Sequence, residues 1–399
     1  MEMLRVANVI EEGRYGGPQS RIAAVAEKLR DRNIETVVIL PERDSEVLYK
    51  KLCEKGILTR RLSQHRLTRQ KVHFIKYVVF FIPEVLSLYR LLKSDAFDVV
   101  HVNGSYQIKS AIAGKIAGVP IVWHLNDTFM APVIRRACIL VAKYCAAGFI
   151  VAGERVYDYY IRGNALERKP CIEINAPVDT GTFDPCSVMP DERIASHEGI
   201  KILTVANINP VKGLEFFIEM AYHLNVKYKD LNFFIGGEVY NSQRRYHEML
   251  RQHLVAKKLR NVTFLGRLDD VASALKSADI CVYTSLSEAS PTAVWESMAM
   301  GKPTVTTDVG SVRKYIEDGK SGFVVPVRDS ESLAQRVELL IEDASLRERV
   351  GREARAVAME KLDLSVVSEK HALFYQEIAA NHSSGGRDLR THRKPVLDE

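Results

Sequence analysis

The residues from Ile280 to Val309 alternate between strand and helix patterns, and this alternation restricts the fold more than any other feature of the chain. The apolar run Ile280–Tyr283 is typical of a buried strand, and the β-branched run Thr304–Thr306 is typical of a second one. Between them, Thr292 stands where a helix N-cap is expected and Gly301 stands where that helix ends. The order strand, helix, strand predicts two parallel strands joined by a crossover helix, as in α/β sheets.

Two glutamates, Glu288 and Glu296, flank the start of this predicted helix. Glu288 lies on the loop after the first strand and Glu296 in the first helical turns, so both are expected at the carboxyl edge of a parallel sheet, where ligands bind. The N–H groups and the positive dipole end of a helix suit phosphate. Carboxylates are good acceptors for paired sugar hydroxyls. The pair therefore indicates a nucleotide-sugar pocket; the alternative is a surface helix with one solvated glutamate and one first-turn glutamate.

The sequence around the two glutamates resembles the C-terminal domain of the family-4 retaining glycosyltransferases of the GT-B fold, without a gap from about Asn261 to Asp329. The resemblance is carried by the two glutamates with seven residues between them, then by Ser-Met-Ala-Met-Gly-Lys-Pro, Asp-Val-Gly-Ser and Tyr-Ile-Glu-Asp-Gly-Lys-Ser-Gly-Phe-Val-Val-Pro. The family usually has glycine after its first glutamate, whereas this chain has Ala289, whose Cβ narrows the approach to the sugar. The resemblance implies an α/β fold with two Rossmann-like domains whose parallel sheets face each other across a cleft, and a donor held mainly by the second domain.

The resemblance also implies roles for individual residues. Glu288 would hold hydroxyls of the sugar, Glu296 would hold the ribose diol, and Lys212, with the helix that begins near Thr292, would hold the leaving diphosphate. Position 207 is usually an arginine in the family, whereas Asn207 donates hydrogen bonds but carries no charge. Either Lys212 acts alone, or another base such as Arg267 helps, or activity is reduced. The remaining donor-binding residues implied by the resemblance are Gly16, Gly17, Gly237, Gly266, Arg267, Leu268, Ser290 and Ala293.

The first part of the chain opens with a strand-like run from Leu4 to Ile10, a glycine-rich loop and a helix from Ser20 to Arg30. This is the start of a βαβ unit, but it lacks G-x-G-x-x-G and does not support a dinucleotide fingerprint. The Gly-Gly turn can also serve packing alone. His101 and His124 lie in consecutive predicted strands near the expected ligand edge. By the resemblance, His124 is a catalytic residue near the transferring sugar, and the acceptor side holds Gln19, His101 and Asn126.

A length of 399 residues suits two domains. We expect an acceptor-side domain at 1–179, a linker at 180–199, a donor domain at 200–362, a helix at 363–380 that crosses back to the first domain, and a disordered tail at 381–399. The six cysteines form no C-x-x-C pair, so neither a zinc site nor a disulfide framework is indicated, and a reducing cytosol fits. No D-x-D motif stands in a suitable place, and Asp269-Asp270 lacks that spacing. We therefore expect no metal and no cofactor, with Lys212 and the helix dipole supplying the positive charge.

Residues 49–76 carry a net charge of +8 in a chain whose net charge is +6. One acid, Glu54, stands among nine basic residues: Lys50, Lys51, Lys55, Arg60, Arg61, Arg66, Arg69, Lys71 and Lys76. The apolar run Val78–Ile82 follows directly. This pattern is typical either of a solvated basic surface or of contact with an anionic membrane or a diphosphate-linked acceptor. Nucleic acid is not expected, because aromatic residues are not interleaved with the basic ones. We predict a cytoplasmic protein at the inner face of the membrane.

Together these features predict a retaining, metal-independent enzyme that moves a hexosyl unit from a nucleotide diphosphate sugar to a hydroxyl acceptor in cell-envelope polysaccharide or glycolipid synthesis. UDP- and GDP-linked donors are favoured as partners, and a lipid-linked acceptor is compatible with the basic segment. Two other classes stay open. One is a sugar-nucleotide epimerase of related fold, which needs no acceptor; the other is a catalytically weak nucleotide-sugar-binding protein, which Asn207 makes conceivable.

Overall fold

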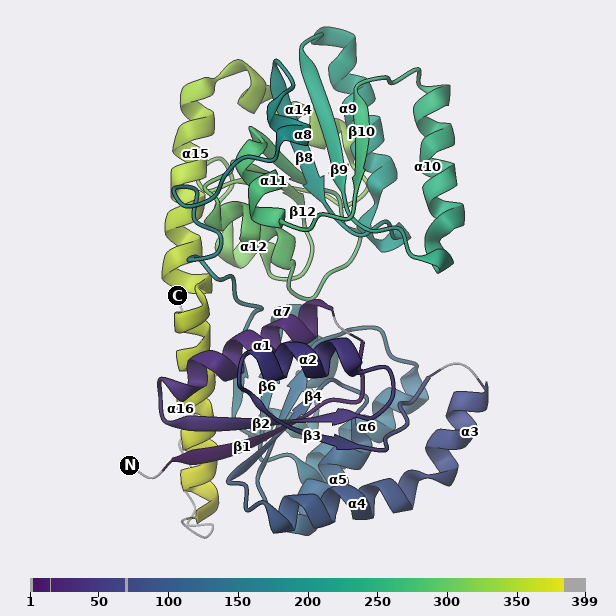
Figure 1. Cartoon of the computed structure of the whole chain (residues 1–399), viewed down its shortest axis with the longest axis vertical. Helices are drawn as coiled ribbons and strands as arrows, with labels where there is room; N and C mark the ends of the chain where they lie inside the picture. The colour runs from purple at the N-terminus through teal and green to yellow at the C-terminus, as the bar shows by residue number, and fades with distance from the viewer. Residues whose placement is uncertain (1–2, 15, 69–70, 384–399) are drawn as a thin grey trace. The chain divides into compact units, whose positions relative to one another are not determined.

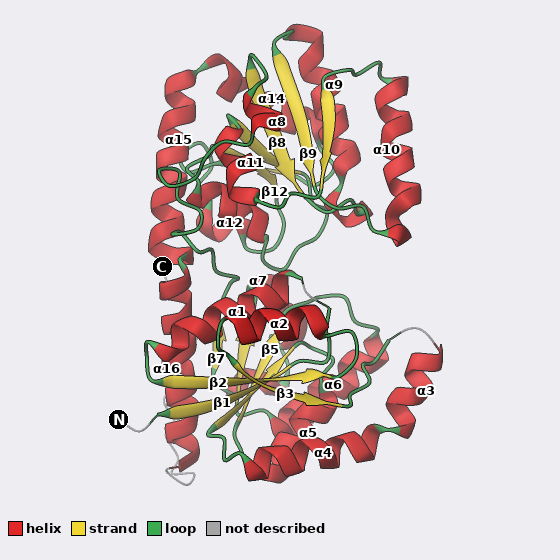
Figure 2. Cartoon of the chain, viewed as in Figure 1, coloured by secondary structure: helices red, strands yellow, loops and turns green. Residues whose placement is uncertain are grey.

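The computed structural model describes residues 3–14, 16–68 and 71–383, which form two compact α/β units (Figures 1 and 2). Unit 1 comprises residues 1–176 and 364–399, and unit 2 comprises residues 177–363. Arg69 of the basic segment and residues 384–399 of the expected tail lie outside the described residues. Every pair of neighbouring strands in both sheets is parallel, which confirms the α/β architecture predicted from the strand–helix alternation.

Unit 1 is built on a seven-stranded sheet with the order β3-β2-β1-β4-β5-β6-β7. Its strands are β1 (Leu4–Val9), β2 (Ile34–Pro41), β3 (Leu58–Leu62), β4 (Val99–Asn103), β5 (Ile121–Leu125), β6 (Gly148–Val151) and β7 (Cys171–Glu173). The central strands are buried on both faces and therefore read as continuous apolar runs. The strand order reverses between β1 and β4, and a reversal of this kind is where open α/β sheets bind ligands.

Helices cover the sheet of unit 1. They are α1 (Gly17–Arg30), α2 (Glu46–Glu54), α3 (Lys71–Val79), α4 (Phe81–Ser94), α5 (Ile108–Ala117), α6 (Pro132–Cys145), α7 (Glu154–Tyr160), the short 3₁₀ turn η1 (Ala165–Arg168) and α16 (Leu364–Ser383). Helix α5 packs between α4 and α6, while α16 packs beside α1. Phe374, Tyr375 and Ile378 of α16 join the apolar core of the sheet. A Cβ at Gly148 would lie 2.8 Å from Ile378 Cδ1, so glycine there allows α16 to pack closely on β6.

Unit 2 contains a six-stranded sheet with the order β10-β9-β8-β11-β12-β13, which reverses between β8 and β11. Its strands are β8 (Ile200–Val205), β9 (Leu231–Gly236), β10 (Val262–Gly266), β11 (Ile280–Tyr283), β12 (Thr304–Thr307) and β13 (Phe323–Val325). Its helices are α8 (Glu192–Ala195), α9 (Leu214–Lys227), α10 (Arg244–Ala256), α11 (Val271–Ser277), α12 (Thr292–Ala299), α13 (Val312–Tyr315), α14 (Ser330–Glu342) and α15 (Ala344–Val357). Shorter turns are η2 (Pro210–Lys212), η3 (Asn241–Gln243) and the π-helical turn η4 (Ala358–Leu362).

The segment at 180–199, expected as a linker, is packed into unit 2. Ile194 of α8 is fully buried in a core cluster of that unit. The backbone N–H of Asp191 donates to Ser277 Oγ at 2.7 Å, and the Asp191 side chain accepts from Arg193 N–H and so caps α8. The polar, proline-containing composition of the segment concealed this buried apolar anchor and the cap of α8.

Candidate functional site

Helix α12 begins beside the strand reversal of unit 2. Thr292 is its first helical residue, and Pro291 occupies the N-cap position, one residue earlier than the sequence predicts. The reason is that the Pro291 carbonyl already accepts from the N–H groups of Val294 and Trp295, at 3.0 and 3.3 Å. The N–H groups of Thr292 and Ala293 thus lie in the first turn, where a helix offers donors to a ligand.

Lys212 and Glu288 are brought together at this helix terminus. Gly213 has a φ of +59°, and a Cβ there would lie 2.3 Å from the carbonyl oxygen of Thr284. This close backbone approach places the loop after β8 against the loop after β11. The ammonium of Lys212 contacts the carboxylate of Glu288, and Ser285 Oγ donates to the same carboxylate at 2.9 Å. The two side chains are 29% and 19% exposed, so the pair is accessible to a ligand.

Glu296 lies on the first turns of α12, where it is half-buried. Burial raises the pKa of its carboxyl to about 7, while the positive charge of Lys212 opposes this rise. Near neutral pH the carboxyl can therefore act as an acceptor when ionised and as a donor when protonated. The neighbouring Trp295 is fully buried, and its indole N–H donates to Ser290 Oγ at 3.1 Å, which ties the loop to the helix.

A cavity of about 30 Å³ lies at this edge of unit 2. Its lining includes Lys212, Glu288, Thr292 and Ala293. The volume accommodates on the order of one or two water molecules, so the cavity corresponds to only a small part of a nucleotide sugar. The cavity nevertheless brings together the ammonium of Lys212, the carboxylate of Glu288 and the start of α12.

The other donor-side residues lie on the loops after β8, β9 and β10. Asn207 is exposed, and its side-chain oxygen accepts from Glu238 N–H at 3.4 Å. Gly237 donates to the Gly266 carbonyl at 2.8 Å, and a Cβ at Gly237 would lie 2.0 Å from the Ala206 carbonyl oxygen. The loops are therefore held together through their backbones. Leu268 is half-buried, and its side chain occupies the space that a Cβ on Gly236 would need. Arg267 is 72% exposed, and its guanidinium lies 3.7 Å from the carboxylate of Asp269.

Asp270, the second acid of the Asp-Asp pair, has a structural role. Its carboxylate caps α11 by accepting from Ser273 N–H at 3.1 Å and from Ser273 Oγ at 2.7 Å. These bonds hold the pKa of the Asp270 carboxyl below its usual range. Across residues 3–14, 16–68 and 71–383, no three His, Cys, Asp or Glu side chains are arranged to hold a metal ion.

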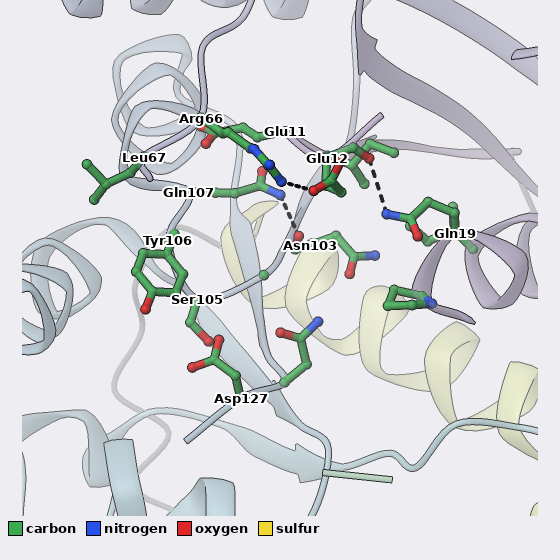
Figure 3. Close-up of a pocket in the computed structure, with 15 residues that line it drawn as sticks. Glu11, Glu12, Gln19, Arg66, Leu67, Asn103, Ser105, Tyr106, Gln107 and Asp127 are labelled. Atoms are coloured by element: carbon green, nitrogen blue, oxygen red, sulfur yellow. Dashed lines mark hydrogen bonds and ion pairs between the residues drawn. The ribbon is translucent and has the colours of Figure 1, made fainter. Parts of the chain in front are cut away.

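Unit 1 has a larger cavity, of about 260 Å³, at the reversal between β1 and β4 (Figure 3). The residues that follow β1, β4 and β5 line it, together with the first turns of α1. Polar side chains of this lining include Glu11, Glu12, Gln19, Arg66, Asn103, Ser105, Tyr106, Gln107, Asn126 and Asp127. Gln19 and Asn126, predicted on the acceptor side, are thus brought together.

Glu11 is a buried carboxylate on this cavity wall. It is 7% exposed, and its Oε1 has no hydrogen-bond partner among the described residues. The Lys109 ammonium lies 3.9 Å from this oxygen but bonds to Glu84 at 2.5 Å. One buried cation therefore faces two carboxylates. Burial raises the pKa of Glu11 to about 7; Lys109 lowers this pKa and Glu84 raises it.

The other acids of the cavity wall, Glu12 and Asp127, already have partners within unit 1. The Arg66 guanidinium contacts the Glu12 carboxylate, and Gln19 donates to the Glu12 carbonyl at 3.2 Å, as Figure 3 shows. Asp127 accepts from the hydroxyl of Tyr160 at 3.0 Å. Ser105 is buried beside Tyr160, with which its hydroxyl interacts. Oxygen atoms that accept no hydrogen bond, beside charged groups that already have partners, suit the neutral hydroxyl groups of a ligand better than they suit a phosphate.

His101 and His124 do not line this cavity. Both are buried, at 1% and 0% exposure; their ring centroids lie 5.3 Å apart, and they lie 5.9 and 6.2 Å from the ring of His371 of α16. Arg21 Nη1 lies 3.2 Å from His124 Nε2. Burial and the neighbouring cation lower the pKa of His124 well below its usual range, so the ring is neutral. Both rings are therefore closed off from solvent in this structure, and their contacts with the sugar and the acceptor stay predictions.

Gly16 and Gly17 lie at the start of α1 and are less constrained than the glycines of unit 2. A Cβ at Gly17 would meet nothing within 4 Å, and one at Gly16 would meet only the Gln19 side chain at 3.5 Å. Packing of the chain against itself therefore does not require glycine at either position.

The residues that the sequence argument missed, chiefly Glu11, Ser105 and Asp127, directly follow strands. Because ligands bind at the carboxyl ends of parallel strands, these positions could have indicated the three residues as candidates from the sequence.

Comparison with known proteins agrees with this architecture. The family described as "Glycosyltransferase Family 4" matches residues 15–181, and the family described as "Glycosyl transferases group 1" matches residues 190–357. The alpha-D-kanosaminyltransferase of Streptomyces kanamyceticus is 34% identical over 180 residues, which cover 44% of this chain and 45% of that protein. The matched part spans about half the length of the first curated relatives.

Two further comparisons extend over most of the chain. An N,N'-diacetylbacillosaminyl-diphospho-undecaprenol alpha-1,3-N-acetylgalactosaminyltransferase of Campylobacter jejuni is 23% identical, covering 90% of this chain and 95% of that protein. The crystal structure of Anabaena HepE in complex with UDP and glucose has a TM-score of 0.79 at 19% identity, covering 94% of this chain and all of that one. The two matched families account for both units, and the chain belongs to the family-4, group 1 glycosyltransferases of the GT-B fold.

Proposed function

We propose that the protein is a retaining glycosyltransferase that takes a hexosyl unit from a nucleotide diphosphate sugar and transfers it to a hydroxyl of a lipid-linked sugar. The observation that carries this proposal is the accessible Lys212–Glu288 pair at the start of α12. A cation and a helix N-terminus stabilise the negative charge that develops on a departing diphosphate. The carboxylate beside them is an acceptor for sugar hydroxyls. Retention of the anomeric configuration is an expectation from family membership.

The donor would lie on unit 2. As the bond from the anomeric carbon to phosphate breaks, its electron pair would leave with the diphosphate, where the Lys212 ammonium and the first-turn N–H groups of α12 would stabilise the charge. The acceptor oxygen would bond to the anomeric carbon, and its proton would pass to the departing diphosphate. The ammonium has three protons, so it can keep its contact with Glu288 while it binds the phosphate. Glu296 would bind the ribose diol. Asn207 adds no charge, and Arg267 is mostly exposed and already near Asp269, so Lys212 and α12 carry this task in our proposal.

The acceptor would lie on unit 1, in the cavity lined by Glu11. Its free acceptor oxygens and compensated charges favour a neutral polyol such as a sugar ring. The Campylobacter relative is named for a sugar on diphospho-undecaprenol, and an Escherichia coli relative, 26% identical over 279 residues, is named for a similar acceptor. These names support a lipid-linked sugar as the acceptor class here.

The test is incubation with a panel of UDP-, GDP- and ADP-sugars, with and without short-chain polyprenyl-diphosphate sugars. We expect transfer only with an acceptor present, and an α-linked product from an α-linked donor. An epimerised nucleotide sugar without acceptor would instead identify an epimerase. Binding that raises the melting temperature without any turnover would identify a binding protein, because a specific ligand stabilises the folded state by mass action.

A further inference from the structure

Helices α3 and α4 expose a group of large apolar side chains at the periphery of unit 1 (Figure 1). We call this group the α3–α4 apolar surface. It consists of Val72, Phe74, Ile75, Val78, Val79, Phe80, Ile82 and Leu86, each between 43% and 69% exposed. Folded monomeric proteins rarely expose so many large apolar side chains together without a binding role.

The local structure explains why these side chains stay exposed. Within Val72–Val79 only Tyr77 is buried. Its ring packs edge-on against Phe81 at 5.7 Å and lies 4.4 Å from the Lys109 ammonium. Helix α3 is thus held mainly by one aromatic anchor, while apolar side chains occupy most of its remaining circumference. A helix of this composition normally needs an apolar environment on more than one side.

Charge identifies the kind of environment. The segment from Val72 to Ser94 contains one acid, Glu84, which is 6% exposed and bonded to Lys109 and His65. Lys76, Arg90 and Lys93 are exposed beside the apolar residues. An apolar face flanked by cations and free of exposed acids matches the interface of an anionic bilayer.

The preceding basic segment contributes less than its net charge of +8 suggests. Lys55 pairs with Glu27, Arg60 with Asp95, Arg61 with Glu46 and Arg66 with Glu12. These acids lie outside the segment, so the sequence count missed the compensation. The structure therefore shifts the main attraction from the basic residues to the α3–α4 apolar surface.

Neither helix is suited to cross the bilayer by itself. No single helix in the described ranges is long and apolar enough for a span, although Val72–Val79 and Phe81–Ser94 together satisfy such a test with a bend of 56° between them. The inner face of α4 is already occupied, because Val85, Leu88 and Leu92 are buried in unit 1. The helix pair is thus placed to lie in a membrane interface while its core side remains packed.

We propose that the α3–α4 apolar surface docks unit 1 on an anionic phospholipid leaflet, with the apolar side chains inserted among the lipids and Lys76, Arg90 and Lys93 at the headgroups. This goes beyond transfer chemistry and does not depend on the donor or acceptor assigned above. It would hold the protein where lipid-linked substrates are found.

The experiment is flotation of the full chain with vesicles of phosphatidylglycerol and phosphatidylcholine, compared with vesicles of phosphatidylcholine alone. We expect wild type to float with both and more strongly with the anionic ones. Ile75→Ser combined with Val78→Ser should lower the partition coefficient about tenfold for each side chain withdrawn from lipid. Lys76→Gln, Arg90→Gln and Lys93→Gln should each lower it about fivefold on anionic vesicles, with little effect on neutral ones.

The matched control is Val226→Ser combined with Val255→Ser, because these valines are 72% and 78% exposed and lie in unit 2, outside the α3–α4 apolar surface. Its partition coefficient should equal that of wild type. The proposal is overturned if wild type stays in the aqueous phase at low salt, or if the α3–α4 variant floats as well as the control. It is also overturned if wild type is a dimer in lipid-free buffer and the α3–α4 variant is a monomer, since a second copy would then cover the surface. Nucleotide binding, measured by titration calorimetry, should be the same in all of these variants whichever outcome is found.

Discussion

Each unit holds a lysine–glutamate pair near the strand reversal of its sheet, and the two pairs differ in burial. Lys109 and Glu84 of unit 1 have side chains 3% and 6% exposed, whereas Lys212 and Glu288 of unit 2 are 29% and 19% exposed. A buried pair is costly to break, because the partner left behind has no water to solvate it. An accessible pair can exchange its partner for a ligand at low cost. The first pair is therefore part of the fold, and the second is the one that we propose binds a substrate.

The loops around the two pairs differ in the same way. In unit 2, glycines at 213, 237 and 310 each allow a backbone approach that a Cβ would block at 2.6 Å or less. In unit 1, a Cβ at Gly17 would meet nothing within 4 Å and one at Gly16 only the Gln19 side chain at 3.5 Å, and the neighbouring Pro18 and Gln19 line the larger cavity. The loops at the edge of the unit 2 sheet are thus held by their own backbone around a small cavity, whereas the loops at the edge of the unit 1 sheet leave room for a ligand.

The largest effect is expected when the buried pair is broken. Lys109→Met leaves Glu84 and Glu11 without their buried cation and should lower the free energy of unfolding by about 3 to 5 kcal/mol. Urea denaturation followed by circular dichroism measures the loss. Lys115→Met is the control, because this lysine is exposed on the same helix, and its effect should stay within about 0.5 kcal/mol. Equal effects of the two substitutions would contradict a structural role for Lys109.

The next effect concerns Glu11, whose pKa is raised from 4.5 to about 7. Between these two values the folded state holds a proton that the unfolded state has released, so stability falls as pH rises through this window and stays lower above it. Glu11→Gln removes this loss of stability, so the variant should be more stable than wild type by about 3 kcal/mol above pH 7. If Glu11 also binds acceptor hydroxyls, the same variant should lose acceptor turnover about tenfold.

Denaturation across pH and steady-state kinetics test this combination of gained stability and lost activity. Glu12→Gln is the neighbouring control, because Glu12 is half-buried and paired with Arg66. A Glu11→Gln variant whose stability depends on pH as wild type does would remove Glu11 as the titrating group. One that is stabilised but fully active would instead remove it from the acceptor site.

The accessible pair should show the opposite behaviour. Lys212→Ala should lower kcat about a hundredfold, because a preorganised charge at the leaving diphosphate is lost, with little change in melting temperature. Lys257→Ala is a close control: Lys257 is also 29% exposed and pairs with Glu219 at 3.0 Å in the same unit. The contrast between the two edges fails if Lys212→Ala keeps near-full kcat, or if it destabilises the protein as strongly as Lys109→Met.

The two edges also differ in how far the sequence predicts them. Glu288, the start of α12 and Glu296 lie in one continuous stretch, so local spacing was enough to place them. Lys212 lies 76 residues from Glu288 and reaches it because β8 and β11 are neighbours at the strand reversal. Family resemblance pointed to this lysine, but its contact with Glu288 was not foreseen.

In unit 1 the decisive contacts are between distant elements. Glu11 follows β1, Glu84 lies on α4 and Lys109 on α5, and only the packing of α5 beside α4 brings the lysine to both acids. His371 of α16 closes over His101 and His124 from the far end of the chain, which no local pattern reveals. A histidine at a strand end was therefore an ambiguous signal.

We propose that the carboxyl edge of the unit 2 sheet binds a nucleotide sugar, with Glu296 on the ribose and Glu288 on the sugar. Titration calorimetry of free UDP, GDP and ADP with wild type, Glu288→Ala and Glu296→Ala tests it most directly. We predict that wild type binds one of these nucleotides, that Glu296→Ala weakens this binding about tenfold, and that Glu288→Ala leaves it unchanged while abolishing sugar transfer. Equal weakening by both substitutions, or no binding of any of the three nucleotides to wild type, would contradict the account.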